Sequence, residues 1–435
     1  MKASSEVLDV EEKVDPQIVL ADERYSIIGE ILCDVYEPGH AKWSWSDSLD
    51  KVFLNRYLGL PVFLVIIWSM FNFTFQASAV FMAIIEAIFE WIGGYTSQIP
   101  IPWLASLLTD GVIGGVGFIL VFVPPIMFMY FAISVLEDSG YLTRAAFVMD
   151  RIMVRMGLQG RSFIPLLLGF GCTVPAIMAA RTVDGESNRL TTILVSPLMS
   201  CAARLPVYVL IAGVFFPDIA GTIVFLLYIL GIVMAVSMAL VFKKTIFKEE
   251  STPLLMELPM YQVPTFHGSI IHMWERSSLF LKKAGTYLLA GAIILWFISN
   301  TGPGGFGVPV EESFVSIIGH FFQPLFAPLG FNWQIVAALI FGLLAKEVVV
   351  EAIGVIYAAQ GEAALAGALA ASITPVSAIA LMVFVLLYTP CIAVIGTVRK
   401  ETGSNKWTVF SVVYQIVLAY VAALVIVVVG GLLIG

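Results

Sequence analysis

The sequence contains little charge. Asp, Glu, Lys and Arg make up 12% of its 435 residues, whereas hydrophobic residues make up 59%. Soluble domains carry about 25% charged residues, because their surfaces face water. A chain this apolar is typical of a protein whose outer faces are covered by lipid. We therefore predict an all-α, polytopic integral membrane protein.

Several functional motifs are also missing. The four histidines form no HxxH or HExxH pair, and the four cysteines form no CxxC pair, which argues against a histidine metal centre and a disulfide framework. Basic residues are few and scattered, so we expect no nucleic-acid partner. The P-loop motif G-x-x-x-x-G-K-[ST] is absent, so GTP binding by a P-loop is not expected. A nucleophile with a nearby base is not evident either, and we predict that the protein is not an enzyme.

The sequence does contain about eight to nine apolar segments of roughly bilayer length. They are 61–82, 111–135, 163–180, 190–216, 219–242, 284–300, 332–358, 374–397 and 408–434. We divide the chain into a cytoplasmic N-terminal tail with a surface helix (1–50), a first membrane half (51–242), a cytoplasmic loop (243–283) and a second membrane half (284–435).

The distribution of Lys and Arg predicts the orientation in the membrane. Segments 83–110 and 301–331 contain neither residue and are expected outside the cell. Segment 136–162 contains four arginines, segment 243–283 contains lysines and an arginine, and both are expected in the cytoplasm. The number of apolar segments between these loops does not match the number of crossings they require. In each half, one segment should therefore cross incompletely.

Two segments with helix breakers are the best candidates for incomplete crossing, "GFGCTVP" (169–175) and "LLYTPCIAV" (386–394). Proline and glycine interrupt helical hydrogen bonds and leave carbonyls that only protein or a water-filled cavity can satisfy at membrane depth. We predict broken or re-entrant helices here. Matched interruptions in two halves of a chain also indicate a transport site, and the two halves are interpreted as distant repeats.

Three cysteines lie in apolar segments beside proline or small residues: Cys172, Cys201 and Cys391. A buried cysteine can simply serve as a small hydrophobic residue. Three of them, two at matched helix breakers, favour a path lined by thiols, which suits Fe(II), Cu(I) or Zn(II). Met199 is a candidate soft neighbour in this path.

Charged residues inside apolar segments are the second signal, because they are costly there and usually functional. Glu347 and Glu351 are four residues apart, so they share a helix face and require a cation or a proton between them. The adjacent Lys346 either neutralises Glu347 or closes a cavity. Arg204, one turn after Cys201, is expected to pair with a carboxylate or to cap freed carbonyls rather than to contact a ligand.

Five motifs together resemble the membrane domain of the ferrous iron transport protein B (FeoB) family. They are "GFGCTVPAIMAARTV", "SPLMSCAARLPVYVLIAGVFFP", "WERSSLFLKKAGTYLLAGAIILWF", "GLLAKEVVV" and "LLYTPCIAVIGTVRKE". The resemblance covers roughly 21–435. It implies two gate-type repeats around a path for Fe²⁺ in the cell inner membrane, with a cytoplasmic N-terminus. It also implies that Cys172, Cys201, Cys391 and Glu347 line the path.

The chain departs from this family in two respects. Family members usually begin with a GTP-binding domain that is missing here, which leaves an excised domain, a naturally shorter protein or a separate GTPase chain as explanations. Glu351 stands where a small residue is expected, and an added carboxylate favours harder ions such as Mn²⁺. We expect no prosthetic group, Fe²⁺ as the transported ion with Mn²⁺ or Zn²⁺ as alternatives, and the lipid bilayer as a partner. The candidate partners are a separate GTPase, a small cytoplasmic regulator and a second copy of the chain.

The competing hypothesis is a carrier for a nucleoside or another small organic solute, since gate-type repeats also resemble nucleoside carriers. Such a carrier should present Asn, Gln and Ser at the helix breaks, where this sequence offers sulfur. A transporter driven by the metal gradient or by protons, without GTP, is a further alternative.

Overall fold

The structure, a computed structural model, describes residues 24, 26–28, 45–55, 58–96, 99–121, 123–247, 261–343, 346, 348–357, 362–388 and 391–434. Two compact units divide the chain, Met1–Lys51 and Val52–Gly435, and helix α3 (Trp45–Phe53) lies across their boundary. The second unit contains the membrane helices and is described below. The described residues are almost entirely helical, which confirms the all-α prediction. The exception is an antiparallel hairpin of β1 (Thr301–Gly302) and β2 (Gly305–Phe306).

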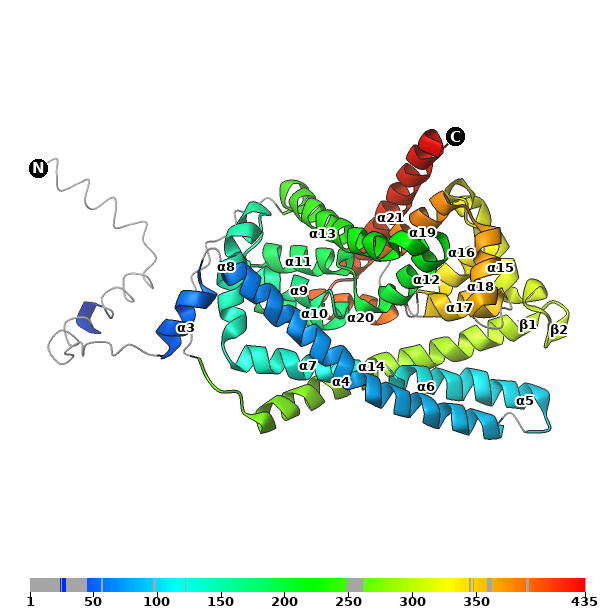
Figure 1. Cartoon of the computed structure of the whole chain (residues 1–435), viewed down its shortest axis with the longest axis horizontal. Coiled ribbons are helices and arrows are strands. Elements are labelled where there is room, and N and C mark those ends of the chain that lie inside the picture. The colour runs from blue at the N-terminus through cyan, green and yellow to red at the C-terminus, as the bar shows by residue number, and fades with distance from the viewer. Residues whose placement is uncertain are drawn as a thin grey trace, which may run out of the picture. The chain divides into compact units, whose positions relative to one another are not determined.

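The long helices α4 and α14 belong to one packed group, in which α7 contacts both of them (Figure 1). The group consists of α4 (Gly59–Thr96), α5 (Pro102–Ser106), the π-helical η1 (Leu107–Ile113), α6 (Gly114–Val121), α7 (Val123–Asp138) and α14 (Phe266–Asn300). Apolar residues occur all around α4, as expected for a helix that faces both lipid and protein. Helix α14 begins at Phe266 and so includes 266–283, part of the segment 243–283 that its polarity predicts as a loop.

Shorter helices make up the remainder of both halves. In the first half they are α8 (Tyr141–Arg155), α9 (Phe163–Leu168), α10 (Thr173–Ala179), α11 (Glu186–Val195), α12 (Leu205–Phe215) and the longer α13 (Ala220–Thr245). In the second half they are α15 (Phe314–Phe326), α16 (Trp333–Phe341), α17 (Val348–Ile356), α18 (Glu362–Ser372), α19 (Pro375–Leu387), α20 (Ile392–Thr402) and the longer α21 (Asn405–Ile434). The largest hydrophobic core joins residues of both halves.

The predicted helix breaks are confirmed. In 163–180, α9 ends at Leu168 and α10 begins at Thr173; in 386–394, α19 ends at Leu387 and α20 begins at Ile392. Two further segments expected as single spans are also broken. Segment 190–216 is interrupted between α11 and α12, and segment 332–358 between α16 and α17. Among the described residues, two of the predicted apolar segments in each half are therefore broken.

Five described helices or helix pairs are long and apolar enough to cross a membrane, and a sixth span results if a pair bent by 107° is counted as one. The five are 61–96, 186–215, 217–245, 375–402 and 405–432, and the bent pair is 314–329 with 333–341. Segment 163–180 is not among them, because α9 and α10 are each too short to cross. The break between α9 and α10 therefore explains why segment 163–180 is not found as a span.

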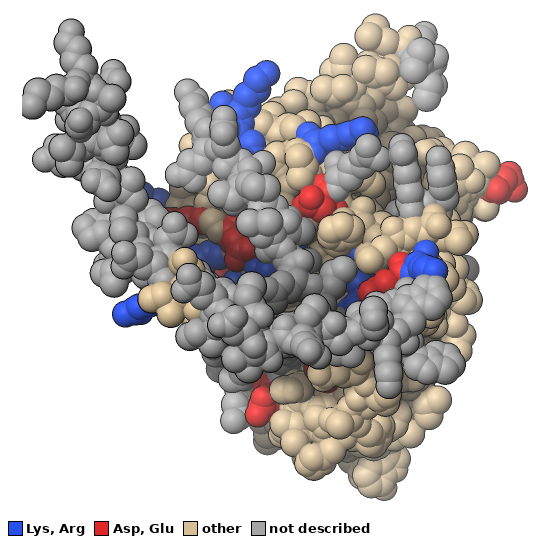
Figure 2. All heavy atoms as spheres, turned by 90° about the vertical axis from the view of Figure 1, so that its left-hand side faces the viewer, with Lys and Arg blue, Asp and Glu red and all other residues tan. Residues whose placement is uncertain are grey.

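Polar side chains gather where α8 and α13 end and α11 begins. Lys243 donates to Ser187 Oγ at 2.9 Å and to Asn188 Oδ1 at 2.5 Å. A Cβ atom at Gly157 would lie 3.2 Å from Lys243 Cγ, so the end of α8 meets the end of α13. Both basic and acidic side chains lie on the side of the molecule seen in Figure 2. The two basic segments predicted on one side of the membrane therefore meet at one polar end, and the side itself stays a prediction.

Candidate functional site

Cys172 and Cys391 lie at the start of two neighbouring helices. Cys172 directly precedes α10 and Cys391 directly precedes α20, and both have extended backbone at the break. Helices α10 and α20 pack against each other (Figure 1). Val174, Ile177, Ala180, Ile193, Val394 and Val398 form a small hydrophobic cluster between them, which we call the seam, and both cysteines pack against it. The structure thus brings one half-buried cysteine from each half to the same seam.

Cys201 lies on a segment that is joined to the Cys172 break. It precedes the 3₁₀ turn η5 (Ala202–Arg204) and is half-buried. The backbone N–H of Ala202 donates to the carbonyl of Gly171 at 3.2 Å. Cys172 directly follows Gly171 and Cys201 directly precedes Ala202, so this hydrogen bond links the two cysteine-bearing segments of the first half.

The break between α16 and α17 is joined to the Cys391 break in the same way. The N–H of Ile392 donates to the carbonyl of Leu343 at 2.9 Å. Lys346 is buried, and its Nζ lies 3.0 Å from the centroid of the Tyr388 ring, a cation–π contact. A Cβ atom at Gly342 would lie 2.2 Å from Tyr388 Oη, so only glycine fits there.

The two predicted carboxylates are not tested by this geometry. Glu347 lies outside the described residues, and Glu351 lies in α17 with its side chain outside the description. Among the described residues, three or more His, Cys, Asp or Glu side chains do not gather closely enough to hold a metal ion. The role of both glutamates, like that of the three thiols, stays a prediction.

The glycines of the "GFGC" segment admit two methionines. Neither Gly169 nor Gly171 has a positive φ, so backbone freedom does not explain them. A Cβ atom at Gly169 would lie 3.0 Å from Met199 Cβ, and one at Gly171 would lie 2.5 Å from Met129 Sδ. Met199 thus packs on the break, and its role as a soft neighbour in a metal path stays a prediction. Met129 was not predicted, because nothing distinguishes it from the other fifteen methionines in the sequence.

Replacing Gly171 with alanine should destabilise the protein, because the new methyl group displaces buried Met129. Overpacking of this kind costs about 1–3 kcal/mol. Thermal unfolding of the purified variant in detergent measures the effect. Gly213→Ala in α12 is the matched control, since a Cβ atom there meets nothing within 4 Å. Equal melting temperatures for the two variants would contradict the close approach of Met129.

Arg204 caps carbonyls at the break between α11 and α12. Its side chain is buried, and its two Nη atoms donate to the carbonyls of Met199 and Pro197 at 3.0 Å each. Helix breaks leave such carbonyls without partners, and a cation is a strong donor to them. The prediction of a capping role is confirmed.

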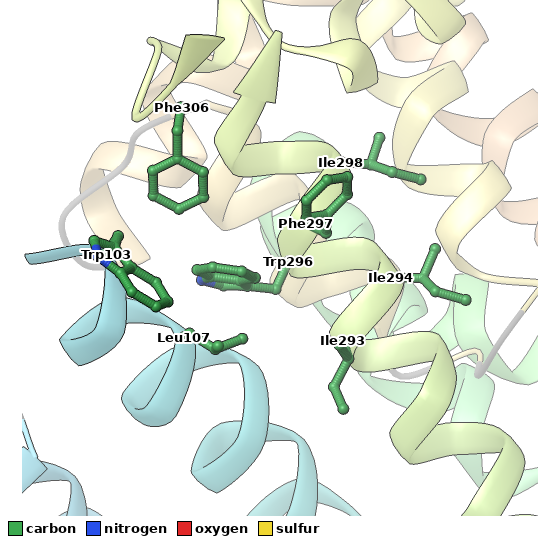
Figure 3. A pocket seen from close by; sticks show the side chains of 8 residues that line it. All are labelled: Trp103, Leu107, Ile293, Ile294, Trp296, Phe297, Ile298 and Phe306. Atoms are coloured by element: carbon green, nitrogen blue, oxygen red, sulfur yellow. The ribbon is translucent and has the colours of Figure 1, made fainter.

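An apolar pocket of about 650 Å³ lies apart from these breaks, between η1 and the end of α14 (Figure 3). Trp296 Nε1 donates to Ser106 Oγ at 3.0 Å beside it. The residues that line it are Trp103, Leu107, Ile293, Ile294, Trp296, Phe297, Ile298 and Phe306. These side chains offer no ligand for a cation, and we assign no ion to the pocket.

Two family profiles match the chain. The Gate family, described as "Nucleoside recognition", matches residues 119–215 and 281–405, about half of the chain. These two ranges contain the four helix breaks described above. The family described as "Ferrous iron transport protein B C terminus" matches 224–276, between the two Gate regions. Two Gate regions confirm the two repeats inferred from the sequence.

The chain is similar to curated proteins along nearly its whole length. The Fe(2+) transporter FeoB of Staphylococcus aureus (strain MSSA476) is 44% identical over 420 residues, which cover 94% of this chain and 63% of the relative. The Fe(2+) transporter FeoB of Methanocaldococcus jannaschii is 43% identical, covering 96% and 64%. A Porphyromonas gingivalis protein named Fe(2+) transport protein A/Fe(2+) transporter FeoB fusion protein is 40% identical, covering 95% and 55%.

The chain thus spans less than two thirds of the length of these relatives. A comparison with solved structures finds no match. The Gate match, the iron-transport profile and the similarity along nearly the whole chain point to the same family. The chain therefore belongs to the FeoB family and corresponds to its membrane domain.

Proposed function

We propose that this protein carries ferrous iron across the cell inner membrane, along a path between the four helix breaks. The observation that carries the proposal is the seam between α10 and α20, against which Cys172 of the first half and Cys391 of the second half both pack. Cys201 joins them through the hydrogen bond between Ala202 and Gly171. The names of the relatives supply the identity of the ion.

The chemistry of the breaks suits this ion. Fe²⁺ accepts thiolate and carboxylate ligands, whereas Na⁺ and Mg²⁺ prefer oxygen alone. A thiol must lose its proton before it binds a metal ion, so uptake should be sensitive to pH. In the proposal, the three cysteines receive the ion while Glu347 and Glu351 supply carboxylates from the 346–357 segment. Movement of one repeat against the other would open the path to each side in turn.

Uptake of Fe²⁺ into proteoliposomes tests the proposal. We expect Cys172→Ser, Cys201→Ser and Cys391→Ser each to lower the uptake rate about tenfold or more, as changes at metal sites commonly do. Cys33→Ser is the matched control, because Cys33 lies in the polar N-terminal segment. Uptake at the unaltered rate in all three variants would refute the cysteine path. Uptake of a radiolabelled nucleoside in place of Fe²⁺ would support the competing hypothesis.

We also propose that a cytoplasmic partner regulates the transporter at the polar end formed by α8, α11 and α13. One relative is named as a fusion with Fe(2+) transport protein A, which supports a small regulator of this kind. A partner that shifts an open–closed equilibrium must bind one state more tightly than the other. Faster uptake on addition of the purified regulator is the expected result, and an unchanged rate with and without GTP would favour a gradient-driven carrier.

A further inference from the structure

A bidentate ion pair joins the two halves at the far ends of α10 and α20. Arg181 lies just after α10, in the 3₁₀ turn η3 (Ala180–Thr182), and Glu401 lies in the last turn of α20. Arg181 Nε donates to Glu401 Oε2 at 2.5 Å, and Arg181 Nη2 donates to Glu401 Oε1. The Glu401 side chain is 5% exposed and that of Arg181 is 52% exposed.

The ion pair and the two cysteines mark opposite ends of the same pair of helices. Cys172 lies nine residues before Arg181, and Cys391 lies ten residues before Glu401. The seam between these ends consists of aliphatic side chains from α10, η3 and α20, together with Ile193 of α11. The two helices therefore run side by side in the same direction, with the thiols at their starts and the ion pair at their ends.

The covalent connections of α10 and α20 do not fix the position of one helix relative to the other. Helix α10 has 7 residues and α20 has 11, and each begins directly after a break. Aliphatic contacts are not directional, so the seam alone does not fix how far one helix slides along the other. A bidentate Arg–carboxylate pair has a specific geometry and does fix it.

We propose that Arg181 and Glu401 are positioning residues, which set the register of α10 against α20 and thereby the separation of Cys172 and Cys391. This inference rests on the proposed function, because the separation of the thiols matters to a metal ion shared between them. A role in overall stability predicts a different result. Because Glu401 is buried, loss of its partner also lowers the free energy of unfolding, so a readout of the helix register is needed beside stability.

Cross-linking with bismaleimides of graded length measures the register directly and without iron. The background is Cys33→Ser with Cys201→Ser, which leaves Cys172 and Cys391 as the reactive pair. We expect Arg181→Glu and Glu401→Arg each to shift or broaden the range of linker lengths that react. The double variant with both exchanges should restore the original range, since it reverses the pair. Arg181→Lys keeps the positive charge but cannot form the bidentate pair of a guanidinium group, so its range of linker lengths should lie between those of the background and Arg181→Glu.

Arg161→Glu is the matched control. Arg161 pairs with Asp184 at 2.7 Å, and both residues belong to the first half, so the pair does not join the halves. Its linker profile should equal that of the background. Equal profiles in the control and in all folded Arg181 and Glu401 variants would overturn the inference. Unfolding of every such variant, Arg181→Lys included, would also overturn it, because the pair would then be a general stabilising contact.

Fe²⁺ uptake by the same exchanges in the otherwise unaltered chain separates this inference from the proposed function. We expect severalfold slower uptake in Arg181→Glu and recovery in the double exchange. If the unaltered chain carries no Fe²⁺ while the linker profiles still shift and recover, the iron proposal fails and the positioning role stands. If uptake depends on the cysteines while the profiles never change, the iron proposal stands and the positioning role fails.

Discussion

Replacing Arg204 with methionine should lower the free energy of unfolding by about 2–4 kcal/mol, because two charge-assisted hydrogen bonds of about 1.5–3 kcal/mol each are lost. The carbonyls of Met199 and Pro197 would stay buried without these donors. Part of the loss is offset, since the variant no longer buries a cation. Because these carbonyls lie directly before Cys201 in the break between α11 and α12, we also expect this segment to lose its conformation.

Chemical unfolding of the purified variant in detergent measures this effect. Arg155→Met is the matched control, because Arg155 is exposed at the end of α8 and its removal should change stability little. Arg204→Lys should fall between the two, since one ammonium group cannot reach both carbonyls with the geometry of a guanidinium fork. A stability of Arg204→Met equal to that of the control would show that the carbonyls are satisfied in another way.

Replacing Gly342 with alanine is expected to disturb two breaks together. The new Cβ atom would lie 2.2 Å from Tyr388 Oη and 2.4 Å from Val349 Cγ2. Tyr388 is buried and carries Lys346 above its ring, so its displacement would also move the buried cation. Overpacking costs about 1–3 kcal/mol, and the movement of the Cys391 break should slow Fe²⁺ uptake as well.

Thermal unfolding and uptake of the same preparation measure both effects. Gly354→Ala in α17 is the matched control, since a Cβ atom there meets nothing within 4 Å and alanine favours the helix. Adding Tyr388→Phe and Val349→Ala to Gly342→Ala should recover part of the stability, because both clashing groups are removed. A variant Gly342→Ala as stable and active as the control would refute the close approach of Tyr388.

Local chemistry explains which features could be read from the sequence. The scarcity of charge predicted the membrane class, and glycine and proline predicted the breaks in 163–180 and 386–394. Arg204 was assigned to freed carbonyls because a cation in an apolar segment needs nearby donors or acceptors to offset its burial. Each of these inferences depends on residues within a few positions of one another. The role of the cysteines and glutamates is a prediction of the same origin and awaits the uptake measurements.

The tertiary structure decided what meets across the molecule. Apolar residues surround most of the membrane helices, so periodicity does not tell which face of a helix contacts protein and which contacts lipid. Small residues and close approach decide instead: Gly171 admits Met129, and Gly342 admits Tyr388. For this reason the seam that joins Cys172 to Cys391, the additional breaks in 190–216 and 332–358 and the Arg181–Glu401 pair were not apparent from the sequence. The residues that meet in the seam and in the ion pair lie far apart in the chain, and only packing brings them together.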